Sequence, residues 1–132
     1  MTHEEALIRA FAAPERADRY LILLASPRRR AKFLSVLAHG FQPDMRFARR
    51  LLGSDSHTSA IERTLRELGA PAICHCVSDN PKLDGKDLPL AEALAATVGY
   101  GMGTLISCLP GELAYYEAED PAERYILRRA AA

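Results

Sequence analysis

The segment LGAPAICHCVSDN, residues 68–80, marks the change from a helical pattern to a strand pattern along the chain. Gly69 and Pro71 end the helical pattern before it, because glycine favours a helix C-terminus and proline cannot continue a helix. Residues 73–77 then form a short apolar run closed by the turn residues 78–81, which is typical of a buried β-strand. The segment therefore divides the chain into a helical half and a half that contains strands.

Before this segment, apolar residues recur at the three- and four-residue spacing of amphipathic helices. Thr2 and Glu5 form a capping-box pattern, and Pro14 and Pro27 each suit the first turn of a helix. Ser59 and Glu62 repeat the capping-box pattern. We expect helices in residues 2–13, 14–25, 27–39, 43–52 and 59–68, the fourth of them burying Phe47, Ala48, Leu51 and Leu52.

After this segment, one helix is predicted between short strands. Asp87 is expected as its N-cap, with an apolar stripe from Leu90 to Val98. Strands are expected in residues 73–77, 104–109, 113–117 and 124–128, and Pro110-Gly111 suits a type II turn. On the strand 113–117, Tyr115 and Tyr116 point to opposite faces, so we expect one in the core and the other in solvent.

The elements together predict an α+β protein. We expect a helical N-terminal half of four to five short helices, packed on a small, mostly antiparallel sheet of about four strands with one intervening helix. The 132 residues suffice for one core, so we expect a single domain, 1–132, with a frayed end at residues 130–132.

The apolar runs, the N-terminal residues and the number of cysteines indicate where in the cell the protein is found. The longest purely apolar run, residues 20–25, is far shorter than a membrane-spanning helix. The N-terminal residues 2–5 lack the positive charge of a secretory signal, and three cysteines are an odd number for a secreted disulfide framework. We therefore expect a cytoplasmic protein that has no membrane contact.

Charge is distributed unevenly although the net charge is zero. Residues 1–70 carry twelve Lys or Arg and eight Asp or Glu, whereas residues 71–132 carry five and nine. At 100° per residue, a basic stripe forms on one face of the third helix, opposite Phe33 and Leu37. The candidate anion- or partner-binding residues are Arg28, Arg29, Lys32 and His39, with Arg46, Arg49 and Arg50 as an extension in the next segment.

The sequence brings its most chemically reactive side chains closest together at Cys74, His75 and Cys76. Because strand side chains alternate, Cys74 and Cys76 share a face and His75 points to the other, which separates the thiol of Cys76 from the imidazole. The three cysteines Cys74, Cys76 and Cys108 are weak candidates for a zinc site, since a fourth ligand has to come from a distant histidine. We favour burial of the cysteines as small apolar side chains in a partly buried strand, because free cysteine is among the most commonly buried residue types.

Two further motifs have structural explanations. The glycines of VGYGMGT, residues 98–104, follow a helix and precede a strand, which is the reverse of a phosphate-binding loop. Asp79 and Asp84 suit turns, although with His75 and Cys76 they form the candidate catalytic region if the protein is an enzyme.

Three functions are therefore open. The first is a small binding or regulatory module acting through protein contacts or self-association, since no catalytic motif or cofactor signature is evident. The second is a small enzyme with its site between Cys74 and Asp84. The third is the binding of nucleic acid or phosphate by the basic helix face.

Overall fold

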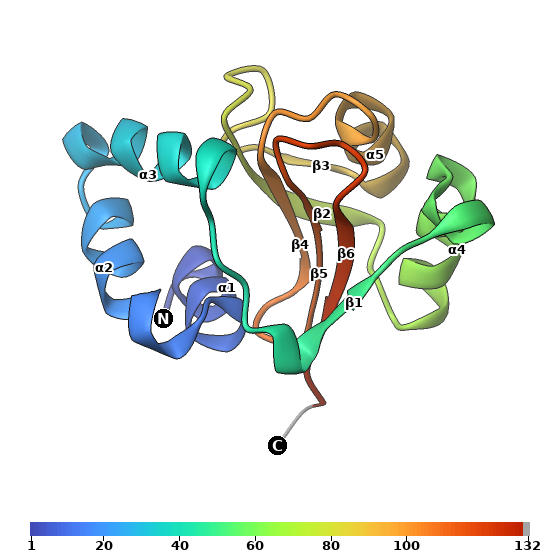
Figure 1. Ribbon diagram of the computed structural model, residues 1–132, viewed down its shortest axis with the longest axis horizontal. Helices are drawn as coiled ribbons and strands as arrows, with labels where there is room; N and C mark the ends of the chain where they lie inside the picture. Colours follow the sequence, from blue (N-terminus) through green and yellow to red (C-terminus); the bar gives the residue numbers. More distant parts are fainter. Residues whose placement is uncertain (131–132) are drawn as a thin grey trace.

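The computed structural model of the protein describes residues 1–130. The frayed end expected at residues 130–132 therefore lies largely outside the described residues. A central antiparallel sheet separates two helical layers, with α1 to α3 on one face and α4 and α5 on the other (Figure 1). The fold class is α+β, as predicted. The helices are α1 (His3–Phe11), α2 (Pro14–Leu24), α3 (Pro27–His39), α4 (Thr58–Glu67) and α5 (Leu90–Thr97).

Within residues 1–130 the sheet has six strands in the order β1-β6-β5-β4-β2-β3, and every neighbouring pair is antiparallel. Three of the predicted strands have the expected bounds. The strands are β1 (Ala48–Arg50), β2 (Ile73–Ser78), β3 (Asp87–Pro89), β4 (Thr104–Leu109), β5 (Leu113–Glu117) and β6 (Arg124–Arg128).

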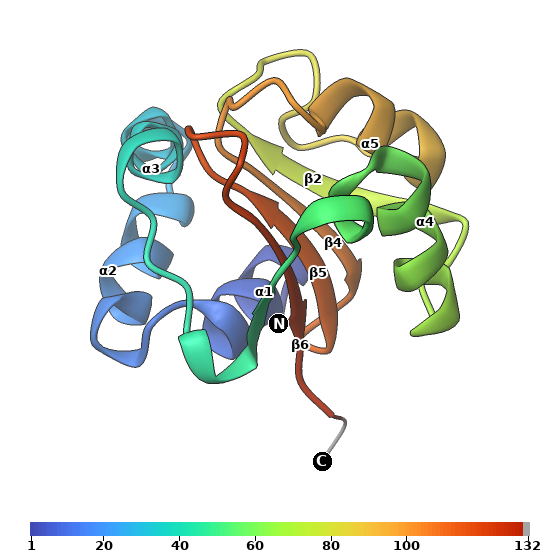
Figure 2. The same cartoon turned by 45° about the vertical axis from the view of Figure 1, so that its right-hand side comes forward.

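Successive side chains along the strands point alternately into two apolar cores, one on each face of the sheet. Val77, Leu105 and Tyr116 face the layer of α1 to α3, where Phe11 and Phe33 pack. The other face carries a second set of apolar side chains, which pack against α4 and α5; this set includes Cys74, Cys76, Ile106, Cys108 and Tyr115. Figure 2 shows both helical layers flanking the twisted sheet.

The helix predicted for residues 43–52 is wrong. Met45–Phe47 makes a single 3₁₀ turn, and Ala48–Arg50 then pairs with β6 as strand β1. The pairing with Leu127, Ile126 and Tyr125 gives this segment backbone partners that a short isolated helix lacks, so tertiary context overrides the local pattern. Leu51 is buried as expected, but Leu52 is 66% exposed.

Two predicted helix caps are also wrong. Asp87 lies in β3, opposite His75 of β2, and α5 begins three residues later. Helix α4 begins at Thr58, one residue before Ser59, so Ser59 lies inside the helix and cannot cap it. By contrast, the cap at Thr2 is confirmed, because its Oγ1 accepts a hydrogen bond from the Glu5 backbone N–H at 3.1 Å.

Tyr115 and Tyr116 are both buried, at 0% and 4% exposure. The expectation that one of them faces solvent is wrong because helices cover both faces of the sheet. Across residues 1–130, each helix is too short or too polar to cross a lipid bilayer.

Candidate functional site

A cluster of charged side chains joins α1, α3 and the β2–β3 region. Arg30 of α3 donates to both carboxylate oxygens of Asp84, from Nε at 2.8 Å and from Nη2 at 2.9 Å. The same guanidinium donates to Glu4 of α1 at 2.7 and 2.9 Å. These charge-assisted bonds raise the pKa of Arg30. The guanidinium therefore bridges two carboxylates from segments far apart in the sequence.

His75 extends the cluster along β2. Its Nε2 lies 2.7 Å from Glu4 Oε2, and its Nδ1 lies 2.6 Å from Asp87 Oδ1. The hydrogen bond with Glu4 raises the pKa of His75 above its ordinary value. Burial alone raises the pKa of Glu4, but the hydrogen bonds with His75 and Arg30 outweigh burial and lower this pKa to about 2. The cluster therefore favours a charged imidazolium between two carboxylates.

His3 lies against the same cluster from the first turn of α1. Its ring stacks on His75 with 5.4 Å between centroids, and its Nε2 lies 2.6 Å from Ser107 Oγ of β4. Burial, followed by repulsion from His75, lowers the pKa of His3. His3 is therefore favoured as the neutral ring.

The cluster of Glu4, Arg30, His75, Asp84 and Asp87 connects the layer of α1 to α3 with the sheet, and we call it the clasp. Arg30, Glu4 and His75 each have charged partners at hydrogen-bonding distance, and their side chains are 22%, 18% and 15% exposed. Ser107 is fully buried, so its hydroxyl faces no open space in which it could attack a substrate. The groups satisfy one another and leave little capacity for a ligand.

The candidate catalytic residues separate in the structure. His75 and Asp84 both belong to the cluster, joined through Glu4 and Arg30. Cys76 lies on the opposite face of the sheet in the α4–α5 core, and Asp79 is exposed at the turn after β2. Burial raises the pKa of the Cys76 thiol to about 12, so this thiol stays protonated near neutral pH.

Sequence reasoning missed three members of the cluster, namely Glu4, Arg30 and Asp87. A signal for Arg30 was present, because at 100° per residue it falls near Phe33 and Leu37 on the inward face of α3, not on the stripe of Arg28 and Lys32. No local pattern pairs Glu4 with His75, because 71 residues separate them.

The cysteine candidates for metal binding all lie buried on the α4–α5 face as free thiols, at Cys74, Cys76 and Cys108. The predicted alternation is confirmed, with His75 on the other face. Among residues 1–130, no three His, Cys, Asp or Glu side chains are arranged to hold a metal ion.

The loop of residues 98–104, which we call the glycine loop, encloses the carboxylate of Glu117. The side chain of Glu117, 1% exposed, accepts hydrogen bonds from the backbone N–H groups of Gly99 and Gly101. The Tyr115 hydroxyl donates to it at 2.9 Å, and Arg124 Nε lies 3.4 Å away. The loop thus binds an anion through backbone N–H groups, but the anion is a residue of the same chain.

An open basic groove runs between α2 and α3. Its volume is about 420 Å³, and its cationic lining comes from Arg16 and Arg19 of α2 and Lys32 of α3. Val36 contributes half-buried apolar surface to it, and the buried side chains of Tyr20 and Leu23 also line it. Within residues 1–130, no carboxylate lines this groove or lies at salt-bridge distance from its three cations.

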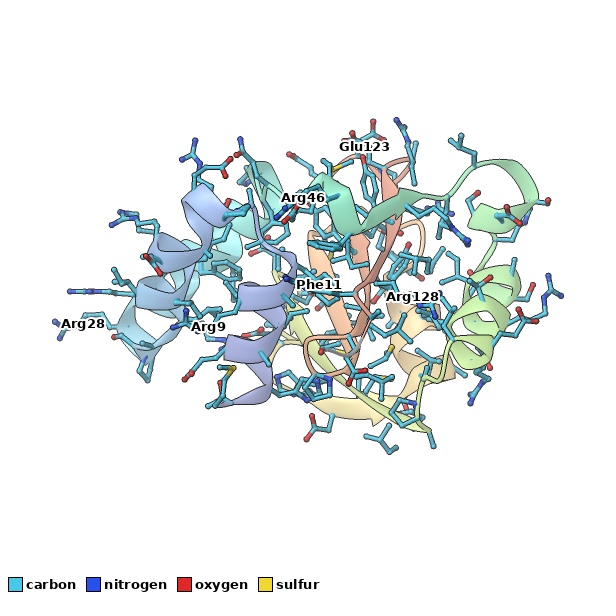
Figure 3. All side chains as sticks on the ribbon, turned by 90° about the horizontal axis from the view of Figure 1, so that it is seen from below. Arg9, Phe11, Arg28, Arg46, Glu123 and Arg128 are labelled. Carbon is cyan, nitrogen blue, oxygen red and sulfur yellow. The ribbon has the colours of Figure 1, made fainter. Side chains whose placement is uncertain are left out.

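The remaining members of the predicted basic stripe have different surroundings. His39 lines one end of the groove, and its Nδ1 lies 3.1 Å from Glu119 Oε2. Arg28 and Arg29 are exposed in the first turn of α3, and Arg28 points away from the body of the molecule (Figure 3).

The second group of basic candidates lies elsewhere. Arg46 donates to the buried carboxylate of Asp44 at 2.8 Å, and Arg49 and Arg50 are exposed on edge strand β1. Figure 3 shows Arg28 and Arg46 far apart. The basic residues therefore form two separate surfaces.

No protein-family model matches the chain, and neither a curated protein nor a solved structure matches it significantly.

Proposed function

We propose that the protein is a small binding module and that its α2–α3 groove takes an acidic segment of a partner protein. The observation that carries this proposal is the lining of the groove. Arg16, Arg19 and Lys32 bring three positive charges to a cavity of about 420 Å³, and within residues 1–130 none of the three forms an ion pair. Such a surface attracts negatively charged partners and repels positive ones.

The apolar part of the lining favours a peptide as the occupant. Val36 is half-buried among the cations, and Tyr20 and Leu23 also line the groove at 4% and 3% exposure. A peptide segment can place an apolar side chain on this surface while its carboxylates meet the arginines and the lysine. Arg28 and Arg46 lie far apart, which argues against one continuous track for a nucleic-acid backbone.

The test is fluorescence anisotropy with a labelled peptide rich in glutamate and leucine, compared with the same peptide carrying glutamine in place of glutamate. We expect the acidic peptide alone to bind, with an affinity that falls as salt is added. The charge-reversal variants Arg19→Glu and Lys32→Glu are expected to weaken binding by about tenfold or more each.

Arg63→Glu is the matched control, because Arg63 is exposed on α4 in the opposite helical layer. Its effect is expected to stay within about twofold, apart from the small change in net charge. Equal binding of both peptides contradicts the proposal, as does an equal loss in the Arg63 variant. Tighter binding of a mixed-sequence DNA duplex than of the acidic peptide favours the phosphate-binding alternative and also contradicts it.

A further inference from the structure

Cys74 and Cys108 lie on neighbouring strands, on the same face of the sheet. Both are free thiols in the α4–α5 core, at 1% and 2% exposure. In the β2–β4 pairing His75 stands opposite Ser107 at the end of the paired register. Cys74 and Cys108 are the next residues along the two antiparallel strands, at the point where β4 has an irregularity in its pairing with β5. Cys76 stands opposite Ile106 and has no cysteine partner in this register.

The backbone hydrogen bonds identify the type of this pair. Cys76 N–H donates to the Lys86 carbonyl, and Gly85 N–H donates to the Cys76 carbonyl, so the polar backbone groups of Cys76 point away from β4. Cys74, two residues earlier on the same strand, has the same orientation. If the register continues to Cys108, the pair is of the non-hydrogen-bonded type, in which Cα atoms of a regular ladder lie about 4.5 Å apart and side chains are closest. This separation falls within the range that a disulfide spans.

The two thiols differ in their readiness to ionise. Contact with the Cys108 thiol, aided by the positive charge of Arg66, lowers the pKa of Cys74. The same contact and burial raise the pKa of Cys108. Cys74 is thus the thiol that more readily becomes the nucleophilic thiolate.

Cys74 also lies close to the surface along the chain. Pro71, Ala72 and Ile73 immediately before it are exposed, and its thiol faces the Pro71 carbonyl at 3.8 Å. A local opening of this connection between α4 and β2 therefore uncovers the sulfur without unfolding the sheet.

We propose that Cys74 and Cys108 form a site of oxidative modification, at which hydrogen peroxide converts the two thiols to a disulfide. The Cys74 thiolate attacks one peroxide oxygen, the O–O bond breaks, and the leaving hydroxide takes up a proton to become water. Cys74 then carries a sulfenic acid. The Cys108 sulfur attacks the Cys74 sulfur, the S–O bond breaks, and the hydroxide leaves with the Cys108 proton as a second water. The two sulfurs together lose two electrons, which reduce the peroxide.

The test is oxidation of the folded protein with hydrogen peroxide, followed by alkylation in urea and mass spectrometry. We expect the wild-type protein to fall from three free thiols to one, with the loss of two hydrogen atoms. Cys76→Ala is the matched control, because Cys76 is equally buried on the same face and outside the pair. In this variant both remaining thiols are expected to disappear together.

The Cys108→Ala variant is expected to form no intramolecular disulfide between Cys74 and Cys76. If this variant fails to fold, fragmentation of the linked peptide from the oxidised wild-type protein still identifies the bonded cysteines. The proposal is overturned if three thiols remain alkylatable, if Cys76 is in the bond, or if Cys74 is oxidised beyond the sulfenic acid with Cys108 still free.

Discussion

Arg30 is the residue on which the clasp depends. It donates four hydrogen bonds at 2.7 to 2.9 Å to the carboxylates of Glu4 and Asp84, and all three side chains are at most 22% exposed. A carboxylate that is partly removed from water is costly without its cation. Most of the stabilisation by Arg30 is therefore the avoided cost of leaving two carboxylates unpaired.

Replacing Arg30 with alanine is expected to lower the free energy of unfolding by about 3 kcal/mol, measured by urea denaturation. Arg29→Ala is the matched control, because Arg29 is exposed on the same helix. Its effect is expected to stay within about 0.5 kcal/mol. Equal losses in the two variants contradict the clasp.

His75 gives the clasp a pH dependence. Glu4 and His3 of α1 and Asp87 of β3 face its ring, and contact with Glu4 raises its pKa in the folded protein. Because the pKa of His75 is raised in the folded protein, its imidazolium stabilises the fold fully at pH values below the ordinary pKa near 6.5. This stabilisation is lost as the pH rises through the pKa of the folded protein. His3 acts in the opposite direction because its pKa is lowered.

The His75→Gln variant isolates this contribution, measured as the difference in unfolding free energy between wild type and variant. We expect this difference to be larger at about pH 5.5 than at about pH 8.5. His57→Gln, at an exposed position before α4, is expected to show no such change. A difference for His75→Gln that is constant with pH, or larger at the alkaline end, shows that the imidazolium is not what the carboxylates stabilise.

The strands β2, β4, β5 and β6 and most helices could be predicted because their patterns are local. The alternation in residues 104–109 and 113–117 and the turn at Pro110-Gly111 are set by neighbouring residues, as is the cap at Thr2. β1 and β3 could not be predicted, because three-residue strands exist only through pairing with β6 and β2. Of the clasp, His75 and Asp84 could be named from the sequence but their partners Glu4 and Arg30 could not, since these residues meet only after the layers assemble.

The glycine loop joins helix α3 to the sheet by close packing. Gly103 has a φ of +64°, and a Cβ placed there would lie 2.5 Å from the Cα of Ala38 in α3. Any side chain at this position therefore forces α3 away from the start of β4. The glycine is required by space as well as by backbone conformation.

Gly103→Ala is expected to lower the free energy of unfolding by more than about 3 kcal/mol, measured by thermal or urea denaturation. Gly85→Ala is the matched control, because Gly85 has a similar φ of +74° with no atom within 4 Å of the added Cβ. The control measures the backbone strain alone, about 1 kcal/mol. If the two variants lose the same stability, the contact with α3 contributes nothing.

At the scale of the whole molecule, some of the charged side chains of the two halves pair with each other inside the fold. Ion pairs between the halves join Arg30 to Asp84 and Glu4 to His75, and His39 lies beside Glu119. Arg16, Arg19 and Lys32 have no such partner among residues 1–130. Part of the excess positive charge of the helical half therefore lies on the α2–α3 groove, and Arg49 and Arg50 carry another part on β1. The sequence showed the α3 side of this groove, but the contribution of α2 depends on how the two helices pack.

The measurement that tests this account most directly is a ¹H–¹⁵N NMR titration of the labelled protein with the acidic peptide. We predict that the amide signals of residues 16–23 and 32–40 shift together and saturate, while those of α4 and α5 stay in place. Shifts centred on β1, on the clasp or on the α4–α5 layer contradict the account, and so does the absence of any shift at low salt.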